Sequence, residues 1–285
     1  MQVLSIQSSV AYGHAGNSSA VFPLQRLGVD TWPVNTVAFS NHTGYGVWRG
    51  AVFEAAQVAD VITGVGERGV FPNLDAVLSG YQGSPEVAEV ILDAVAKVKA
   101  ANPDAVYCAD PVIGDRGRGV YVRPGIAELM RDRIVPAADI TTPNQFELEL
   151  LTGAEVGTLE QLLSAVDVLR SRGPRIVLVT SVEVLDPSDE TISMVAVDDT
   201  GAYVVTTPKL EMNVVAGSGD ATTSMFLGRL LQSGMDVPDA LSKVASSIYG
   251  ILDHTRRTGA GEMEVVAAQD VIANPAEEFV VERLR

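Results

Sequence analysis

Residues 75–109 have the sequence DAVLSGYQGSPEVAEVILDAVAKVKAANPDAVYCA, in which two short apolar runs flank a longer amphipathic one. The short runs, 75–79 and 105–109, do not alternate with polar residues, which is typical of strands buried on both faces of a parallel sheet. Residues 85–101 repeat apolar side chains at helical spacing and predict an amphipathic helix. Together the three runs predict a βαβ unit with a right-handed crossover.

The same rhythm extends in both directions along the chain. Further strands are predicted at residues 3–7, 31–37, 139–142 and 176–180, with Pro33 indicating an edge or a bend in the second. Further helices are predicted at residues 159–172, 221–232 and 238–253. Residues 192–208 contain two strand-like runs around the turn sequence DDTG, which predicts a hairpin. We therefore expect one α/β domain over residues 1–285, with a mostly parallel, doubly wound sheet and an antiparallel edge.

The composition describes a globular chain that is strongly acidic. Among 285 residues, 36 Asp and Glu outweigh 20 Lys and Arg, for a net charge of −16, and 47% of the residues are hydrophobic. The acidic balance argues against a nucleic-acid partner, because phosphate contacts need an excess of Lys and Arg. No run approaches the roughly 20 apolar residues of a membrane helix, and the first residues lack the basic region of a signal peptide. The single cysteine, Cys108, excludes an internal disulfide, so we expect a cytoplasmic protein without a membrane partner.

Ligands of such sheets bind beyond the carboxyl ends of the strands, so the residues after each strand are the candidate site. Residues 8–17 (SSVAYGHAGN) are either a ligand-facing loop with Ser8 at the strand tip or a plain loop with an N-cap at Asn17 or Ser18. Residues 39–46 (FSNHTGYG) suit a flat polar ring, although a surface loop over a buried Phe39 explains them nearly as well. Tyr81, after the strand at 75–79, is either a core aromatic or a stacking platform.

Two further loops carry charged residues and glycines. Residues 110–119 (DPVIGDRGRG) are either a mobile lid over an anion or an ordinary exposed loop. In residues 141–147 (TTPNQFE), Thr142 or Asn144 can cap a helix, and Glu147 can hold Mg²⁺ through water, although capping alone also explains the pattern. His14 and His42 are not expected to bind zinc, because three histidines and one cysteine offer no paired spacing.

The sharpest feature is residues 213–223 (NVVAGSGDATT), where two glycines lead into an apolar helix. Backbone N–H groups at such a turn, together with the helix dipole, form an anion hole. Asp220 directly follows this turn, next to the anion hole, and can take the proton from an attacking hydroxyl group. The alternative is an Asp N-cap after a glycine turn. The stretch is not a P-loop, because the G-x-x-x-x-G-K-[ST] pattern is absent.

Taken together, these stretches resemble the pyridoxal kinases (pyridoxamine kinases) of the ribokinase-like superfamily over nearly the whole chain. The resemblance is carried by residues 39–45, 110–112, 139–147 and 217–220. It implies a three-layer α/β/α fold and ATP-dependent phosphorylation of the 5′-hydroxymethyl group of pyridoxal, pyridoxamine or pyridoxine in vitamin B6 salvage. It also implies Mg²⁺, a monovalent cation and a homodimer.

The resemblance also implies a role for individual residues. Asp220 would be the general base, and the anion hole would be formed by Gly217, Ser218 and Gly219. The pyridine ring would be hydrogen-bonded by Ser8 and Thr43, in a pocket lined by Phe39, His42 and Tyr81. The ATP phosphates and the metal would be met by Asp110, Thr142, Asn144 and Glu147, with Asp110 and Glu147 at the metal. Other nucleotide contacts would come from Thr180, Ser181, Pro208, Lys209 and Leu210, and the lid from Asp115 and Tyr121.

Four positions depart from the family pattern. Ser218 stands where many members have Thr, which keeps the hydroxyl group, and Thr180 stands where some bacterial members have Lys. Arg116 and Arg118 have no general counterpart in the lid. A helix N-terminus also favours the ionised form of Asp220, which weakens it as a base.

Two other functions fit part of the pattern. A hydroxymethylpyrimidine kinase of the same superfamily would share the anion hole, the base and the metal residues, but the stretch from His42 to Tyr45 favours pyridoxal. A non-catalytic pyridoxal-binding protein would not need the intact stretch from Gly217 to Asp220.

Overall fold

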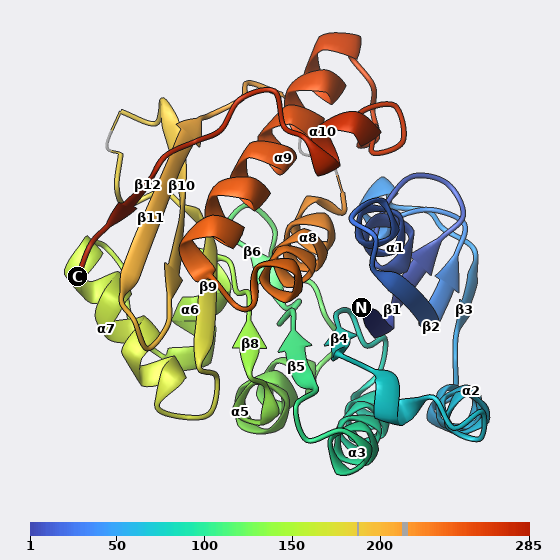
Figure 1. Cartoon of the computed structure of the whole chain (residues 1–285). Coiled ribbons are helices and arrows are strands. Elements are labelled where there is room, and N and C mark those ends of the chain that lie inside the picture. Colours follow the sequence, from blue (N-terminus) through green and yellow to red (C-terminus); the bar gives the residue numbers. More distant parts are fainter. Residues whose placement is uncertain (187, 213–215) are drawn as a thin grey trace.

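In the computed structural model, which describes residues 1–186, 188–212 and 216–285, one large sheet runs through the protein (Figure 1). Among the described residues its ten strands lie in the order β12-β11-β10-β9-β8-β5-β4-β1-β2-β3. Their bounds are β1 (Gln2–Val10), β2 (Asp30–Phe39), β3 (Gly50–Val52), β4 (Ala76–Ser79), β5 (Val106–Ala109), β8 (Ile140–Thr141), β9 (Ile176–Val182), β10 (Thr191–Val197), β11 (Ala202–Pro208) and β12 (Val281–Arg283). A separate small hairpin pairs β6 (Gly114–Asp115) with β7 (Gly119–Val120).

Strand direction divides the sheet into a parallel centre and antiparallel margins. The strands β2, β1, β4, β5, β8 and β9 are parallel to their neighbours within that group. At the margins, β3 is antiparallel to β2, and β10, β11 and β12 follow β9 in antiparallel pairs. The predicted hairpin at residues 192–208 is therefore confirmed as β10 and β11. Pro33 pairs with the β1 side only, because β3 reaches no further along β2 than Val37 in the described register.

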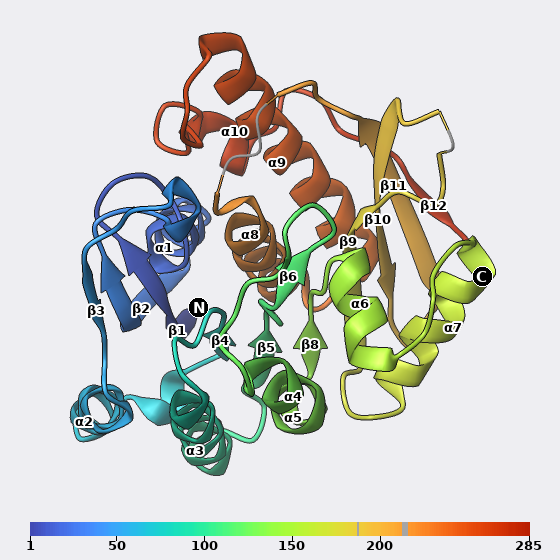
Figure 2. The ribbon, with the colours of Figure 1, turned by 180° about the vertical axis from the view of Figure 1, so that it is seen from behind.

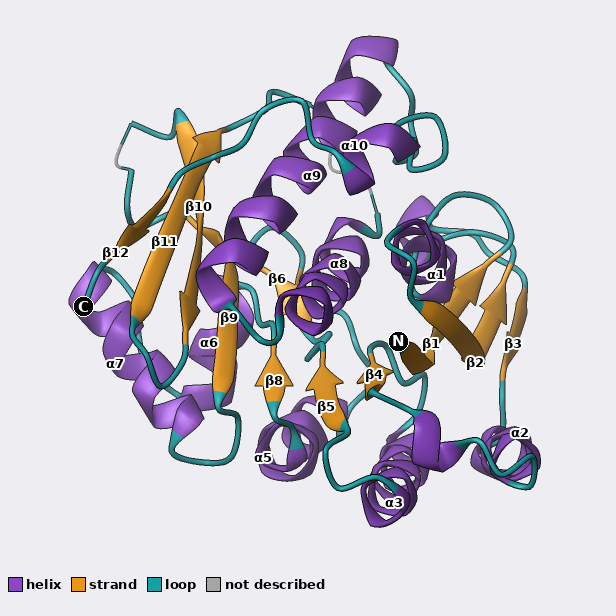
Figure 3. Ribbon diagram, viewed as in Figure 1, coloured by secondary structure: helices purple, strands orange, loops and turns teal. Residues whose placement is uncertain are grey.

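Helices cover both faces of the sheet, as Figures 2 and 3 show from opposite sides. Their bounds are α1 (Asn17–Arg26), α2 (Ala55–Gly66), α3 (Pro85–Ala101), α4 (Ile126–Leu129), α5 (Val135–Ala137), α6 (Gln145–Thr152), α7 (Leu159–Arg170), α8 (Ser218–Ser233), α9 (Val237–Thr258) and α10 (Gln269–Ala273). Helices α1, α8, α9 and α10 lie on one side and α2 to α7 on the other, so the predicted three-layer α/β/α fold is confirmed.

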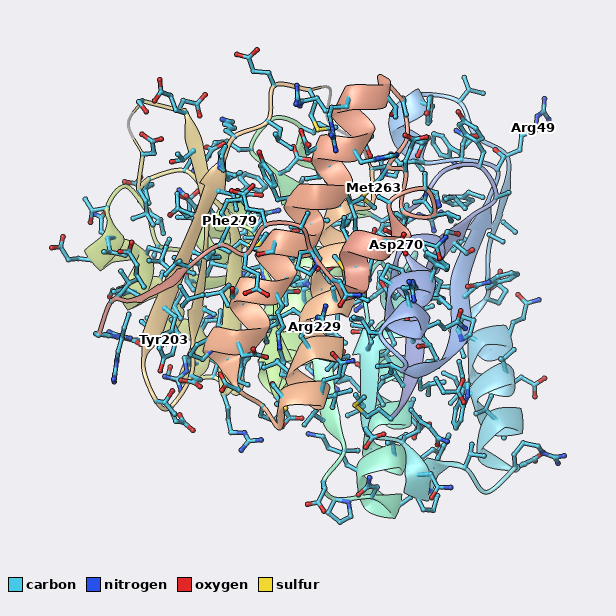
Figure 4. The ribbon with its side chains drawn as sticks, turned by 45° about the horizontal axis from the view of Figure 1, so that its top comes forward. Arg49, Tyr203, Arg229, Met263, Asp270 and Phe279 are labelled. Atoms are coloured by element: carbon cyan, nitrogen blue, oxygen red, sulfur yellow. The ribbon has the colours of Figure 1, made fainter. Side chains whose placement is uncertain are left out.

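Each face of the sheet has its own hydrophobic core, because successive strand residues point to opposite faces. In β4, Val77 belongs to the core under α3, whereas Leu78 belongs to the core under α8 and α9. Burial on both faces explains why these strands are apolar without alternation. On the second face, Arg229 of α8 donates to the carbonyl oxygens of Ile272 (2.7 Å) and Ala273 (3.0 Å), which holds the end of α10 (Figure 4).

The start of α1 differs from the prediction. Neither Asn17 nor Ser18 caps the helix, because Asn17 is its first residue and Gly16 precedes it without a side-chain cap. The Asn17 side chain is buried and instead accepts a hydrogen bond from Ser5 Oγ (2.7 Å). Burying the amide in a polar network therefore outweighs the local capping preference. No helix within the described residues has the length and apolar character needed to cross a membrane.

Candidate active site

The carboxyl ends of the parallel strands meet at one edge of the sheet, and backbone hydrogen bonds hold them side by side. Asp110 N donates to Ser79 O (2.9 Å), and Thr142 N donates to Ala109 O (3.3 Å). Thr180 N donates to Pro143 O (2.9 Å), which extends the series to β9. This edge of the sheet brings the ends of β4, β5, β8 and β9 together, as the parallel topology predicts.

The glycine turn before α8 depends on the absence of a side chain at Gly217. Gly217 has a φ of +84°, and a Cβ atom there would lie 1.9 Å from His14 O. The Gly217 carbonyl oxygen accepts from Ser19 Oγ (2.8 Å), so the turn is packed against residues 14–19. Helix α8 then begins at Ser218, and the first N–H groups of a helix have no acceptor within it. Residues 213–215 of the predicted stretch lie outside the described residues.

Asp220 lies in the first turn of α8 and does not cap it. The N-cap is Gly217, without a side-chain cap, so the Asp N-cap alternative is wrong. Oδ2 of Asp220 instead accepts the backbone N–H of Gly16 at 2.9 Å. Loss of hydration raises the pKa of Asp220, and the Gly16 N–H group offsets part of that rise. The carboxylate is therefore a stronger base than its place at a helix N-terminus alone would give.

Asp110, at the end of β5, shares its surroundings with two other carboxyl groups. Burial, and then the charges of Asp220 and Glu147, raise its pKa well above the ordinary value. Hydrogen bonding to Thr223 and Thr142 works in the opposite direction, and the two threonine hydroxyl groups lie 2.7 Å apart. A buried carboxyl group that faces two like charges fits a nearby bound cation, which would relieve the repulsion at Asp110. No group of three or more His, Cys, Asp and Glu side chains in the described part of the chain is placed to hold a metal ion by itself. The protein can therefore offer one or two carboxylates, which fits Mg²⁺ bound mainly by phosphate oxygens.

Glu147 is held by three backbone N–H groups. Its Oε1 accepts from Ile113 N (2.8 Å) and Gly114 N (3.2 Å), and its Oε2 accepts from Asn144 N (3.0 Å). In turn, Oδ1 of Asn144 accepts the backbone N–H of Glu147 (2.9 Å). Asn144, and not Thr142, is therefore the N-cap of α6. Burial raises the pKa of Glu147 to about 7 despite these hydrogen bonds. Glu147 thus ties the start of α6 to the segment that leads into the small hairpin.

That hairpin carries the predicted lid residues. Asp115 accepts from Arg118 N (2.8 Å) and Arg118 Nε (2.7 Å), and the Arg118 guanidinium lies 5.1 Å from the centre of the Tyr121 ring. A Cβ atom at Gly44 would lie 3.6 Å from an Arg118 nitrogen, so the hairpin reaches the loop after β2. Arg116 instead faces Glu149 (3.3 Å) and Glu183 (3.7 Å). The two lid arginines therefore point to different parts of the molecule.

We call residues 39–49, which run from the end of β2 to the start of β3, the ring loop. Phe39 ends β2 and packs on Trp48, with ring centres 6.2 Å apart. His42 Nδ1 accepts the N–H group of Gly44 (3.1 Å), and burial, followed by the charge of Arg118, lowers the pKa of His42. Thr43 is exposed in the short helical turn that follows.

A cavity of about 440 Å³ opens beside the ring loop. It is lined by Tyr12, Ser40, Asn41, Tyr45 and Val47. Ser8 is almost fully buried and contacts Gly16, since a Cβ atom at Gly16 would lie 2.3 Å from Ser8 Oγ. Because Gly16 also bonds Asp220, Ser8 lies one residue away from the candidate base. Tyr81 is half-buried, and burial raises its pKa.

The predicted nucleotide residues fall into two groups. Thr180 is bridged to Asn144, which connects β9 to the Glu147 network, and the next residue, Ser181, has a φ of +52°. Pro208 ends β11, Lys209 N donates to Glu190 O (2.8 Å), and the Lys209 ammonium group pairs with Asp189. Within the described residues, no hydrogen bond or ion pair joins residues 208–210 to Asp110, Glu147 or Asp220.

The structure adds two residues to which the sequence pattern assigns no role. Thr223 lies one helical turn after Asp220, and that spacing is the signal that could have identified it. Glu262 follows α9 and bonds residues near both Asp220 and the ring loop; we find no local sequence signal for it.

Comparisons with known proteins show which family the chain belongs to. A family model described as phosphomethylpyrimidine kinase matches residues 70–266. Pyridoxal kinase PdxY of Leifsonia xyli is 54% identical over 284 residues, covering all of both chains. Pyridoxal kinase PdxY of Rubrobacter xylanophilus is 55% identical over 285 residues, covering all of this chain and 98% of the relative. The structure of pyridoxal kinase from Leishmania donovani with ADP and pyridoxamine superimposes with a TM-score of 0.91 at 28% identity, covering 100% and 99% of the two chains. The chain therefore belongs to the phosphomethylpyrimidine kinase family and, within it, to the pyridoxal kinases.

Proposed function

We propose that this protein transfers the terminal phosphoryl group of ATP to the 5′-hydroxymethyl group of pyridoxal, pyridoxamine or pyridoxine. The observation that supports this most directly is the place of Asp220, in the first turn of α8 and beside the glycine turn. A base and an anion-binding helix N-terminus at one point are what transfer from ATP to a hydroxyl group requires.

In this proposal, Asp220 accepts the proton of the substrate hydroxyl group while the N–H groups of Ser218 and Gly219 bind the transferring phosphoryl group. Desolvation favours proton uptake, because it raises the pKa of Asp220. The N–H group of Gly16 keeps the carboxylate oriented, since it holds one oxygen and leaves the other for the substrate. Phosphoryl transfer depends mostly on positioning and charge neutralisation, which these rigid groups supply.

Asp110 and Glu147 are the residues that we propose for Mg²⁺, with Thr142 and Asn144 beside the phosphates. A bound Mg²⁺ ion would neutralise charge on the phosphate oxygens. The support from this chain is the cluster of buried carboxyl groups, in which Asp220 and Glu147 both raise the pKa of Asp110. Thr180, Ser181 and residues 208–210 are proposed for the remainder of the nucleotide.

For the vitamin ring we propose Ser8, Phe39, His42, Thr43 and Tyr81. The low pKa of His42 keeps its imidazole neutral, so that it can exchange hydrogen bonds with a neutral polar ring. The small hairpin with Asp115 and Tyr121 is proposed as the lid. It reaches the ring loop through Arg118, which also lies over the partly exposed ring of Tyr121. Partial burial, and then the charges of Glu147, Asp110 and Asp220, raise the pKa of Tyr121. A closed lid would exclude water from the transferring phosphate.

A direct assay tests the proposal and its two alternatives. Purified protein is incubated with ATP and Mg²⁺ and, in separate reactions, with pyridoxal, pyridoxamine, pyridoxine and hydroxymethylpyrimidine. We expect phosphorylation of at least one B6 vitamer; turnover of the pyrimidine alone would instead assign the chain to the activity for which its family model is named. Binding of pyridoxal without any turnover would support the non-catalytic alternative.

We further propose that the protein works as a cytoplasmic homodimer and needs a monovalent cation besides Mg²⁺. The buried, unpaired Cys108 is in keeping with a reducing compartment. Light scattering measures the mass in solution, and the assay repeated with K⁺, Na⁺ or neither measures the cation requirement.

A further inference from the structure

One carboxylate to which the proposed function assigns no role, that of Glu262, joins the two halves of the proposed site. Glu262 lies in the segment between α9 and α10. Its Oε1 accepts from the hydroxyl group of Tyr45 in the ring loop (2.5 Å), and its Oε2 accepts from the backbone N–H of His14 (3.3 Å). These partners are 217 and 248 residues away in sequence, so the carboxylate connects three separate parts of the chain.

Packing on both sides holds Glu262 in place. The next residue, Met263, is fully buried in the core with α8 and α9 and is labelled in Figure 4. On the other side, Gly13 has a φ of +81°, and a Cβ atom there would lie 2.1 Å from Glu262 Oε2. A glycine at this position therefore provides both the backbone conformation and the space for the carboxylate.

Residues 13–16 carry the connection onward to the base. At one end of this segment, the N–H group of His14 bonds Glu262. At the other end, the N–H group of Gly16 bonds Asp220, and between them His14 O contacts the turn at Gly217. The segment is thus held between Glu262 and the glycine turn.

We propose that Glu262 is a positioning residue for phosphoryl transfer, which sets the separation between the ring loop and the Asp220 carboxylate. This inference rests on the proposed function, in which the substrate spans those two points: its ring against the ring loop and its hydroxymethyl group against Asp220. The Tyr45 bond fixes the ring loop, and the His14 bond fixes the segment that orients the base. If the ring loop or the segment that orients Asp220 shifts, one rigid substrate can no longer contact the ring loop and the Asp220 carboxylate equally well.

The test compares Glu262→Gln with Glu264→Gln as a matched control. Glu264 is two residues away and bonds Thr258 (2.5 Å), with His254 at 3.5 Å, so it contacts neither partner of Glu262. We expect Glu262→Gln to raise KM for the vitamer by roughly three- to tenfold, as loss of a charge-assisted hydrogen bond does. We expect KM for ATP to stay unchanged, and Glu264→Gln to match the unmodified protein in both.

Two further measurements distinguish positioning from a general loss of structure. The charge of Asp220 acts on Asp110 and Tyr121, and its carboxylate accepts the Gly16 N–H group. Of these groups, Gly16 is the one in the segment that Glu262 bonds. Loosening the Gly16 bond removes support for the ionised carboxylate, so the acid limb of the kcat profile should move to higher pH in Glu262→Gln. The double variant Glu262→Gln/Tyr45→Phe should lose less transition-state free energy, calculated from kcat/KM for the vitamer, than the two single variants lose in sum. The reason is that both substitutions remove the same hydrogen bond, between Tyr45 and Glu262.

A spectroscopic readout keeps this inference separate from the proposed function. The hydrogen bond to Glu262 is the largest of the effects that raise the pKa of Tyr45 to about 12. Glu262→Gln should lower that pKa, giving more phenolate absorbance at pH 11, and Tyr45→Phe should remove the change. If the unmodified protein phosphorylates no vitamer, the proposed function fails whatever this titration shows. Unchanged vitamer KM and acid limb in Glu262→Gln of an active enzyme, or strictly additive effects with Tyr45→Phe, would overturn the positioning role.

Discussion

The backbone N–H of Gly16 donates to Oδ2 of Asp220 at 2.9 Å, although the two residues are 204 positions apart in the chain. The bond joins the segment after β1 to the first turn of α8. A backbone group has little freedom to move once its segment is packed, so it orients the carboxylate more firmly than a long side chain would. The bond also favours the ionised form, which limits how far desolvation can raise the pKa of Asp220.

The first prediction concerns the base. Asp220→Asn keeps the size of the side chain and an oxygen for the Gly16 N–H group, but it cannot accept the substrate proton. We expect kcat to fall about 10²- to 10⁴-fold, the usual contribution of a general base. Pyridoxal binding, measured by calorimetry, should stay within a few-fold of the unmodified protein. An unchanged kcat would remove Asp220 from this role.

The second prediction compares two neighbouring glycines. Gly217→Ala places a Cβ atom 1.9 Å from His14 O in a residue with a φ of +84°, whereas nothing lies within 4 Å of a Cβ atom at Gly219. We expect the first change to destabilise the protein by more than about 1 kcal/mol, because both strain and a backbone clash must be relieved. Gly219→Ala lies inside a helix and should leave the melting temperature unchanged or raise it. Thermal unfolding of both variants decides the matter, and equal melting temperatures would contradict the steric argument.

The third prediction concerns pH and Mg²⁺. The pKa of Glu147 is raised to about 7 in the folded protein, and that of Asp110 is also raised. Between the ordinary value of 4.5 for Glu147 and about 7, the folded state therefore binds more protons than the unfolded state. The stabilisation from the protonated carboxyl groups is complete below pH 4.5 and is lost as the pH rises through 7. Without Mg²⁺, we expect the melting temperature to fall between pH 5 and pH 8.

Mg²⁺ should reverse part of that fall, because it binds the ionised carboxylates. The increase in melting temperature on adding Mg²⁺ should thus be larger at pH 8 than at pH 5. Asp110→Asn should reduce both the pH slope and the Mg²⁺ effect. Glu89→Gln, which changes a carboxylate in an exposed pair with Arg133, is the matched control and should leave both unchanged. A Mg²⁺ effect that is independent of pH would argue against a metal at these carboxyl groups.

The fourth prediction separates the two lid arginines. Arg118 bonds Asp115, lies over Tyr121 and approaches Gly44, whereas Arg116 faces Glu149 and Glu183. Arg118→Ala should loosen the hairpin and admit water, so ATP hydrolysis without a vitamer should rise relative to vitamer phosphorylation. Arg116→Ala removes partly exposed ion pairs and should change kcat/KM by less than about fivefold, since such pairs contribute at most about 1 kcal/mol. The opposite ranking would assign the lid contact to Arg116.

Much of the fold could be predicted because burial on two faces makes parallel strands uniformly apolar. The helix predicted at residues 85–101 is α3, with the same bounds. The hairpin at 192–208 was also identifiable, since its turn residues are local in sequence. The cap of α1 could not be predicted, because the amide of Asn17 is satisfied by Ser5, Val34 and Asn35, which lie on two other strands.

The candidate site likewise contains residues that the sequence could identify and contacts that it could not. Asp220, Asp110 and Glu147 could be found because each lies next to a recognisable strand end or helix start. That Asp220 is not a cap, and that a distant glycine holds it, depends on packing between segments that no local pattern records. Glu262 escaped prediction for the same physical reason: its partners are more than two hundred residues away.

The place of the ring loop at the open margin of the sheet has a consequence for protein engineering. Residues 43–49 are exposed, and β3, which begins at Gly50, pairs with only one strand among the described residues. Randomised libraries or grafted segments confined to this stretch would leave both hydrophobic cores untouched. Selections for phosphorylation of unnatural heterocyclic alcohols can therefore begin there without first adding stabilising mutations elsewhere.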